Sequence, residues 1–191
     1  MYGISKYDGK VAKGSVQDVA QQQGRQIEDV MMEVDAVIIV DTSGSMASSD
    51  EQTNSRYERA VSALEYYQQE IPGKILVVSF SSDAKFCLNG YPDYQGGGTD
   101  MTRALQFVHL ADSIKGMNFI LISDGQPDSE VSALSEARKY QNKINTVFIG
   151  SENGYGRDFL KKLSNATGGQ SVVDFKAMNM RKALKEVLLL T

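Results

Sequence analysis

Short unbroken runs of apolar residues alternate along the chain with longer stretches in which apolar residues recur every three or four positions. The short runs are typical of strands buried on both faces, as in a parallel sheet beneath helices. They fall at residues 37–40, 74–80, 118–123 and 145–149, and a last short strand is expected at residues 171–173.

The longer stretches are predicted to be helices. In residues 56–71, for example, Ala60, Leu64 and Tyr67 fall on one helical face, and a Pro-Gly pair follows. The other predicted helices span residues 101–114, 130–141, 157–165 and 179–190. Strands that alternate with helices of this length indicate a parallel sheet covered on both faces.

We therefore predict an α/β fold with a doubly wound, mostly parallel, Rossmann-like central sheet and helices on both faces. Residues 85–88 are expected to add one short antiparallel edge strand, and Asn89-Gly90 after it is a turn signal. The domain is predicted to span residues 34–191. Residues 1–33 differ in composition and are predicted to be an N-terminal extension, with one helix from about residue 15 to 32 that carries a thin apolar stripe.

Composition narrows the function classes. The chain has 191 residues, of which 41% are hydrophobic and 23% charged, as expected of one globular domain. A formal net charge of −4 without a Lys/Arg-rich run gives no reason to expect nucleic-acid binding. The single Cys87 excludes an internal disulfide and a cysteine-based zinc site. Because no apolar run reaches membrane-spanning length and no signal-peptide pattern follows Met1, we expect a cytoplasmic protein without membrane binding.

The candidate chemistry begins where the first buried strand ends. Asp41, Ser43 and Ser45 follow this strand, and ligands of open α/β sheets lie beyond the carboxyl ends of the strands. All three side chains offer oxygen, the donor atom that hard cations such as Mg²⁺ prefer. The same residue types also cap helices, so this stretch by itself fits a strand end followed by a helix cap equally well.

Two further polar positions favour the metal site. Thr99 follows a glycine run at residues 96–98, and Asp124-Gly125 ends another buried strand. In a doubly wound sheet these positions can converge with the Asp41 stretch on one edge. Two carboxylates and three hydroxyls that converge would form a site for a hard divalent metal.

Together, the three stretches resemble the von Willebrand factor A-type domains. The metal-ion-dependent adhesion site of that family has the pattern Asp-x-Ser-x-Ser, followed by a distant Thr and a distant Asp. All five positions match here, as Asp41, Ser43, Ser45, Thr99 and Asp124. The sequence segments around these positions are also similar to those of the intracellular and prokaryotic branches of the family. These segments are Val-Asp-Thr-Ser-Gly-Ser-Met, Gly-Gly-Thr-Asp and Ile-Ser-Asp-Gly. The resemblance covers about residues 34–190.

The resemblance implies a role for each residue. Ser43 and Ser45 would coordinate Mg²⁺ (with Mn²⁺ or Ca²⁺ as alternatives) through their hydroxyls, and Thr99 would do so directly or through water. Asp41 and Asp124 would act mainly through water or as hydrogen-bond acceptors. An Asp or Glu from a partner protein would fill the open coordination position. Many domains of this kind work beside ATP-driven assembly or remodelling complexes, so such a complex is a candidate partner.

Other residues near these positions have structural interpretations. Asp100 and Asp128 are expected to cap the helices that follow them. Tyr94, in a loop near the presumed site, is a candidate partner contact. His109 is the single histidine and lies in mid-helix among apolar residues, so we expect a structural role. The last helix, with Leu184 among its packing residues, is a candidate for sliding along the sheet when the site fills.

The enzymatic alternative is an Mg²⁺-dependent phosphohydrolase of the haloacid dehalogenase type, which places carboxylates at similar strand ends. That family usually has Asp-x-Asp at the first strand, and Ser43 cannot replace the second Asp as general acid. Its later lysine also lacks a candidate, because Lys115 and Lys143 precede strands. We therefore predict a metal-dependent protein-binding module and no enzyme. A metal-independent structural scaffold is the remaining alternative.

Overall fold

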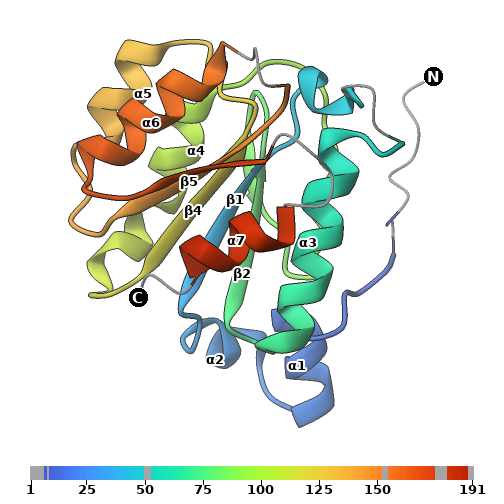
Figure 1. The fold of residues 1–191 in the computed structure, drawn as a ribbon. Coiled ribbons are helices and arrows are strands. Elements are labelled where there is room, and N and C mark those ends of the chain that lie inside the picture. The colour runs from blue at the N-terminus through green and yellow to red at the C-terminus, as the bar shows by residue number, and fades with distance from the viewer. Residues whose placement is uncertain (1–6, 8, 50–52, 152–154, 175–179, 189–191) are drawn as a thin grey trace.

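A computed structural model describes the chain except for residues 1–6, 8, 50–52, 152–154, 175–179 and 189–191. Six strands form one sheet in the order β3-β2-β1-β4-β5-β6 (Figure 1). Their bounds are Ala36–Asp41 (β1), Ile75–Phe80 (β2), Ala84–Phe86 (β3), Asn118–Ser123 (β4), Ile144–Ile149 (β5) and Ser171–Asp174 (β6). β3 pairs antiparallel with β2 at one edge, and all other neighbours are parallel. The predicted sheet, with its antiparallel edge strand, is confirmed.

Helices cover both faces of this sheet, as predicted (Figure 1). Their bounds are Val16–Gln23 (α1), Ile27–Met31 (α2), Arg56–Glu70 (α3), Met101–Val108 (α4), Glu130–Ala137 (α5), Gly156–Ala166 (α6) and Met180–Leu188 (α7). Two short 3₁₀ helices, Gly44–Ala47 (η1) and His109–Ser113 (η2), are also present among the described residues. Helices α1, α2, α4, α5 and α6 pack on one face, and α3 and α7 pack on the other.

The central strand shows why the apolar runs are continuous. Every residue of β1 is buried, because the strand has a parallel neighbour on each side and a helical layer on each face. Val37 and Ile39 enter the core beneath α4 and α6, whereas Ile38 and Val40 enter the core beneath α3 and α7. A strand with only one buried face would have shown alternating polarity instead.

The helix expected over residues 130–141 ends at Ala137, and two further helices differ from the prediction. The single helix expected over residues 15–32 is divided into α1 and α2, because Gly24 takes the left-handed conformation (φ 62°) that ends α1. The helix expected over residues 101–114 ends as an α-helix at Val108 and continues as the tighter η2. The last helix was expected over residues 179–190, and both of those end positions lie outside the described residues.

The segment before β1 is attached to the sheet domain. Val16 and Val19 of α1 and Val30 of α2 are buried in the core that α4 and α6 share. The backbone N–H groups of Ala12 and Gln17 donate to carbonyl oxygens in the turn after β3 at 2.8 and 3.0 Å. These contacts make residues from about 12 onward a packed part of the domain.

Cys87 follows β3 at the edge of the sheet. Its thiol is buried and donates to the hydroxyl of Ser79 at 3.3 Å, and its backbone N–H donates to the carbonyl of Val77 at 2.8 Å. Burial raises the pKa of the Cys87 thiol. The thiol is therefore held protonated and away from solvent.

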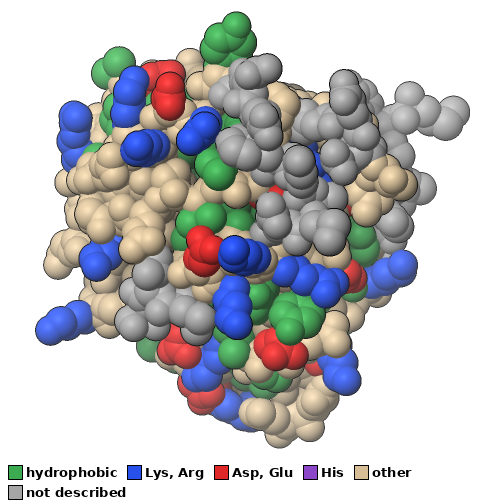
Figure 2. Space-filling view, viewed as in Figure 1, with side chains coloured by type: hydrophobic (Ala, Val, Ile, Leu, Met, Phe, Trp, Pro, Cys, Tyr) green, Lys and Arg blue, Asp and Glu red, His purple; other side chains and the backbone are tan. Residues whose placement is uncertain are grey.

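None of the described helices is long and apolar enough to cross a membrane. Figure 2 shows the face that carries α3 and α7, where blue Lys and Arg side chains lie interspersed with red Asp and Glu side chains.

Candidate metal centre

The candidate site lies at the carboxyl ends of β1 and β4, the two strands at the centre of the sheet. Asp41 is the last residue of β1, and Asp124 directly follows Ser123, the last residue of β4. In this strand order the connections from β1 and β4 run to opposite sides, so their carboxyl ends form the switch point at which open α/β sheets bind ligands. Because the two strands are paired in parallel, Asp41 and Asp124 start from fixed backbone positions at the same edge.

Asp41 is completely buried, and both of its carboxylate oxygens accept hydrogen bonds. Oδ1 accepts from the backbone N–H of Ser43 at 2.9 Å, and Oδ2 accepts from the hydroxyl of Ser123 at 2.6 Å. The Ser123 hydroxyl in turn accepts from the backbone N–H of Gly125 at 2.9 Å. Burial raises the pKa of Asp41 to about 6 although these hydrogen bonds lower it, and the nearby Asp124 charge adds to the increase. A cation at this site would favour the ionised form.

Ser43 and Ser45 converge beside Asp41. Their hydroxyl oxygens lie 3.1 Å apart, within hydrogen-bond distance. The loop that carries them is tied to the glycine run, since the Gly44 N–H donates to the Gly97 carbonyl at 3.2 Å and the Gly96 N–H donates to the Thr42 carbonyl at 2.9 Å. Two parts of the chain more than fifty residues apart are thereby fixed against each other.

Thr99 is buried and held by a residue for which we predicted another role. The Asp128 carboxylate accepts from the backbone N–H of Thr99 at 3.0 Å, and the Asp128 N–H donates to the Thr99 carbonyl at 3.0 Å. The predicted capping role of Asp128 is wrong, because Ser129 caps α5. The prediction for Asp100 is confirmed, because its carboxylate accepts from the N–H of Arg103 in the first turn of α4.

Asp124 uses its two carboxylate oxygens differently. Oδ2 accepts from Nη1 of Arg56 at 2.7 Å, and the two side chains are only 5% and 15% exposed, respectively. Oδ1 is buried and accepts a hydrogen bond from none of the residues that the structure describes. A buried carboxylate oxygen without a donor is costly unless a ligand or water satisfies it. Sequence reasoning did not identify Arg56, because 68 positions separate it from Asp124.

The donors present fit a hard divalent ion. Among the described residues, no three His, Cys, Asp or Glu side chains are grouped so that they could hold a metal ion. The described residues therefore form neither a site for a soft metal ion nor one made mainly of carboxylates. The candidate site instead combines two carboxylates with hydroxyls, and its open acceptor is Oδ1 of Asp124. Oxygen donors with several neutral members suit Mg²⁺ or Mn²⁺, which keep part of their water shell.

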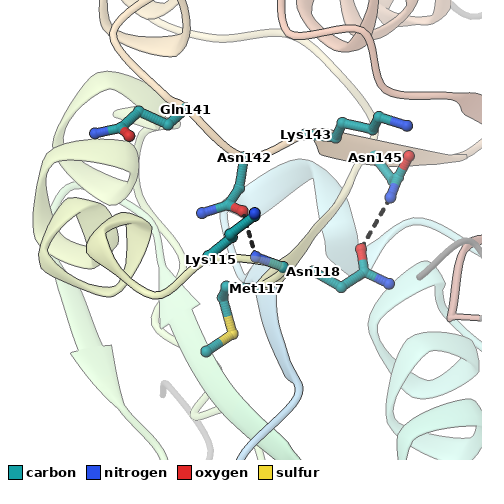
Figure 3. A pocket seen from close by; sticks show the side chains of 8 residues that line it. Lys115, Met117, Asn118, Gln141, Asn142, Lys143 and Asn145 are labelled. Atoms are coloured by element: carbon teal, nitrogen blue, oxygen red, sulfur yellow. Dashed lines mark hydrogen bonds between the residues drawn. The ribbon is translucent and has the colours of Figure 1, made fainter.

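The residues considered for catalysis lie elsewhere. Lys115 and Lys143 border a cavity of about 520 Å³ at the amino ends of β4 and β5, the sheet edge opposite the candidate site (Figure 3). His109 is the first residue of η2, which follows the C-terminal end of α4. Thr99 lies at the other end of α4, just before its N-terminus. Nδ1 of His109 lies 3.1 Å from a Glu136 carboxylate oxygen, and the His109 ring packs against Tyr140.

The loop tyrosines also differ in their surroundings. Tyr94, the candidate partner contact, is partly buried and packs edge-on against Tyr57. Tyr155 is 90% exposed. It directly precedes Gly156, whose backbone is packed so closely on the Asp124-Gly125 turn that an added Cβ would lie 1.9 Å from the Asp124 carbonyl oxygen. Tyr155 is therefore an exposed aromatic side chain close to the candidate site.

Comparison with protein-family models and with curated proteins gives no match. Solved structures do match. The conserved hypothetical protein BatB from Bacteroides thetaiotaomicron is 18% identical, with a TM-score of 0.60 over 81% of this chain and 97% of that one. A von Willebrand factor type A structure from Catenulispora acidiphila is 16% identical, with a TM-score of 0.58 over 81% and 41%. The manganese-loaded TRAP protein of Plasmodium vivax is 16% identical, with a TM-score of 0.52 over 82% and 73%.

These likenesses agree with the strand order, the antiparallel edge and the two helical layers described above. They extend over about four fifths of the chain in each case. The chain therefore has the fold of the von Willebrand factor A-type domains.

Proposed function

We propose that this domain binds Mg²⁺ or Mn²⁺ at the candidate site and uses the ion to recognise an Asp or Glu carboxylate of a partner protein. The observation that carries the proposal is the buried Oδ1 of Asp124, an open acceptor at the sheet edge where the hydroxyls of Ser43 and Ser45 are paired. Nη1 of Arg56 contacts both the Asp124 carboxylate and the Ser45 carbonyl, which connects the two parts of the site. The TRAP structure, which has the same fold, is manganese-loaded. Asp41, Ser43, Ser45, Thr99 and Asp124 are the proposed metal-site residues.

Charge explains why such a site would attract a carboxylate. Asp41, Asp124 and Asp128 place three carboxylates around the candidate site, and Arg56 pairs with one of them, so the site without metal would repel an acidic side chain. A divalent ion would offset this repulsion. If neutral hydroxyls supply most of the direct ligands, the ion keeps enough positive field to bind one more carboxylate. Metal binding would then act as the switch for partner recognition.

We also propose that the domain is not an enzyme. The phosphohydrolase alternative needs a second acid at the Ser43 position and a lysine near the strand ends. The lysines considered for that role lie at the opposite edge of the sheet. A protein partner such as an ATP-driven assembly complex is proposed by analogy with the fold. We propose Tyr155, an exposed aromatic side chain near the candidate site, as one contact of such a partner.

Calorimetric titration of metal-stripped protein with Mg²⁺ and Mn²⁺ tests the metal site. We expect binding to the wild-type domain and none to the Ser43→Ala, Ser45→Ala double variant, because both hydroxyls are direct ligands in the proposal. The matched control is Ser113→Ala, Ser132→Ala, which removes two exposed hydroxyls elsewhere. Binding that survives in the Ser43, Ser45 variant, or absence of binding to the wild type, would contradict the proposed site.

The carboxylate position is tested with Mn²⁺-loaded protein. Acetate or a short Asp-containing peptide should displace a metal-bound water and lower the Mn²⁺-enhanced relaxation of water protons. The neutral amides acetamide and an Asn-containing peptide serve as controls. Equal effects of acid and amide would show that the ion does not select carboxylates.

A further inference from the structure

Arg56 is a cation built into the candidate metal site. It is the first residue of α3, and its Nη1 donates to Oδ2 of Asp124 at 2.7 Å and contacts the carbonyl oxygen of Ser45 at 3.4 Å. The Arg56 side chain is only 15% exposed, and the Asp124 side chain is only 5% exposed. The pair therefore lies in a region where water screens charge poorly.

The stability of α3 does not explain an arginine at this position. A helix N-terminus carries partial positive charge, so a cation in the first turn is electrostatically unfavourable. The N-terminus of α3 already has a capping box, in which Ser55 and Glu58 satisfy each other's backbone N–H groups. The benefit of Arg56 must therefore come from the groups that its guanidinium reaches.

Two of the groups that its guanidinium reaches, the carboxylate of Asp124 and the carbonyl of Ser45, belong to the site that the divalent ion would occupy. Asp41 ends β1 and Asp124 follows β4, its parallel neighbour, so without a cation two buried carboxylates would repel each other at adjacent strand ends. Arg56 offsets this repulsion by pairing with one oxygen of Asp124 and leaves the other oxygen open.

We propose that Arg56 is the intrinsic competitor of the metal, a positioning residue that neutralises Asp124 in the metal-free state and thereby lowers the affinity of the site for divalent ions. The inference rests on the proposed function, because it assumes that the ion binds beside Asp124. A divalent ion that enters the site must either share Asp124 with the guanidinium or displace it, and both are unfavourable to metal binding.

Titration of metal-stripped variants with Mn²⁺ and Mg²⁺ tests this. Arg56→Gln should tighten metal binding by about tenfold, the effect expected when one unit charge is removed from beside a divalent ion in a partly solvated site. Arg56→Lys keeps the charge and should stay within about threefold of the wild type. The control Arg103→Gln removes the same charge from an exposed pair with Asp83 and should change the affinity less than twofold.

A second readout does not depend on metal. Thermal unfolding of the metal-free protein should occur at lower temperature in Arg56→Gln than in the wild type, because a buried carboxylate loses its counter-charge. Saturating Mn²⁺ should raise the unfolding temperature more in the variant than in the wild type, since tighter binding stabilises the folded state further. Arg103→Gln should show neither effect.

The outcomes separate this inference from the proposed function. If the wild type binds metal and the Ser43, Ser45 variant does not, but Arg56→Gln binds with unchanged or weaker affinity, Arg56 does not compete with the metal and the inference is wrong. If neither the wild type nor Arg56→Gln binds metal, the proposed function and the inference both fail. Binding detected in Arg56→Gln but not in the wild type would support competition by Arg56 and would contradict the proposed function of the wild-type domain.

Discussion

The turn after β4 depends on two glycines in direct contact. Gly125 has a φ of 77°, and a Cβ built on it would lie 2.2 Å from the carbonyl oxygen of Gly156. This contact holds the start of α6 against the turn that presents Asp124. A side chain at position 125 would be strained by its own backbone and would push α6 away.

Gly125→Ala is therefore expected to destabilise the domain by about 3 kcal/mol and to weaken metal binding. Gly168→Ala is the control, because Gly168 has a similar φ of 73° but nothing within 4 Å of its added Cβ. The control should cost about 1 kcal/mol, the strain term by itself. Chemical denaturation of both variants measures the difference. Equal losses would mean that the contact with Gly156 contributes nothing.

Glu136 gives the domain a pH-dependent contribution to stability. Burial would raise the pKa of its carboxyl, but hydrogen bonds from Lys139 at 2.6 Å and with His109 at 3.1 Å outweigh it, so the pKa lies below its usual value of 4.5. A carboxyl with a lowered folded-state pKa stabilises the protein above its unfolded-state pKa. That stabilisation is lost as the pH falls through the folded-state pKa.

Glu136→Gln should accordingly lower the free energy of unfolding at pH 7 by about 1–2 kcal/mol, and the difference from the wild type should shrink below pH 4.5. Denaturant unfolding between pH 3 and pH 7 measures it. Glu70→Gln, at an exposed carboxylate, is the control. A difference that stays constant with pH would assign the effect to packing instead of charge.

At the scale of elements, α3 connects the candidate site to the far edge of the sheet. Arg56 at its start reaches Asp124, and Arg59 one turn later lies 3.8 Å from Asp174 at the end of β6, with both side chains of this second pair buried. Helix α7 packs beside α3, where Leu184 and Val187 are buried, and the side-chain amide of Asn118 donates to the Val187 carbonyl at 2.8 Å. These contacts describe how α7 is held; its sliding on ligand binding stays a prediction.

Helices α1 and α2 contribute to the core although they precede the sheet. Val30 is 1% exposed, whereas Met32 just beyond α2 is 78% exposed. Val30→Ala should lower the free energy of unfolding by about 2 kcal/mol, from lost burial and the cavity left behind. Met32→Ala, the larger deletion, should change it by less than about 0.5 kcal/mol. Similar losses in the two variants would show that the α2 segment is not packed in solution as it is in this structure.

At the scale of the whole molecule, the sequence predicts the sheet correctly because the central strands are buried on both faces. Continuous apolar runs such as residues 37–40 have few other interpretations, and the order of strands and helices then restricts the topology. The Asp41, Thr99 and Asp124 stretches were identifiable because each follows a strand or a glycine run. The roles of Arg56 and Asp128 were not, since both act through contacts between distant segments. The break at Gly24 was also missed, although a glycine within a weak apolar stripe is a frequent helix end.

The buried thiol at the sheet edge has a practical consequence for measuring the motions of this domain. Because the chain has one cysteine, any reaction with a thiol reagent reports Cys87 alone. The group is shielded and held protonated, so modification requires transient opening of the edge formed by β3 and the segment docked on it. The labelling rate thus measures the population of this open state directly in the unmodified protein. Comparing the labelling rates with and without Mn²⁺ would show whether metal binding at the ends of β1 and β4 reduces opening of the β3 edge.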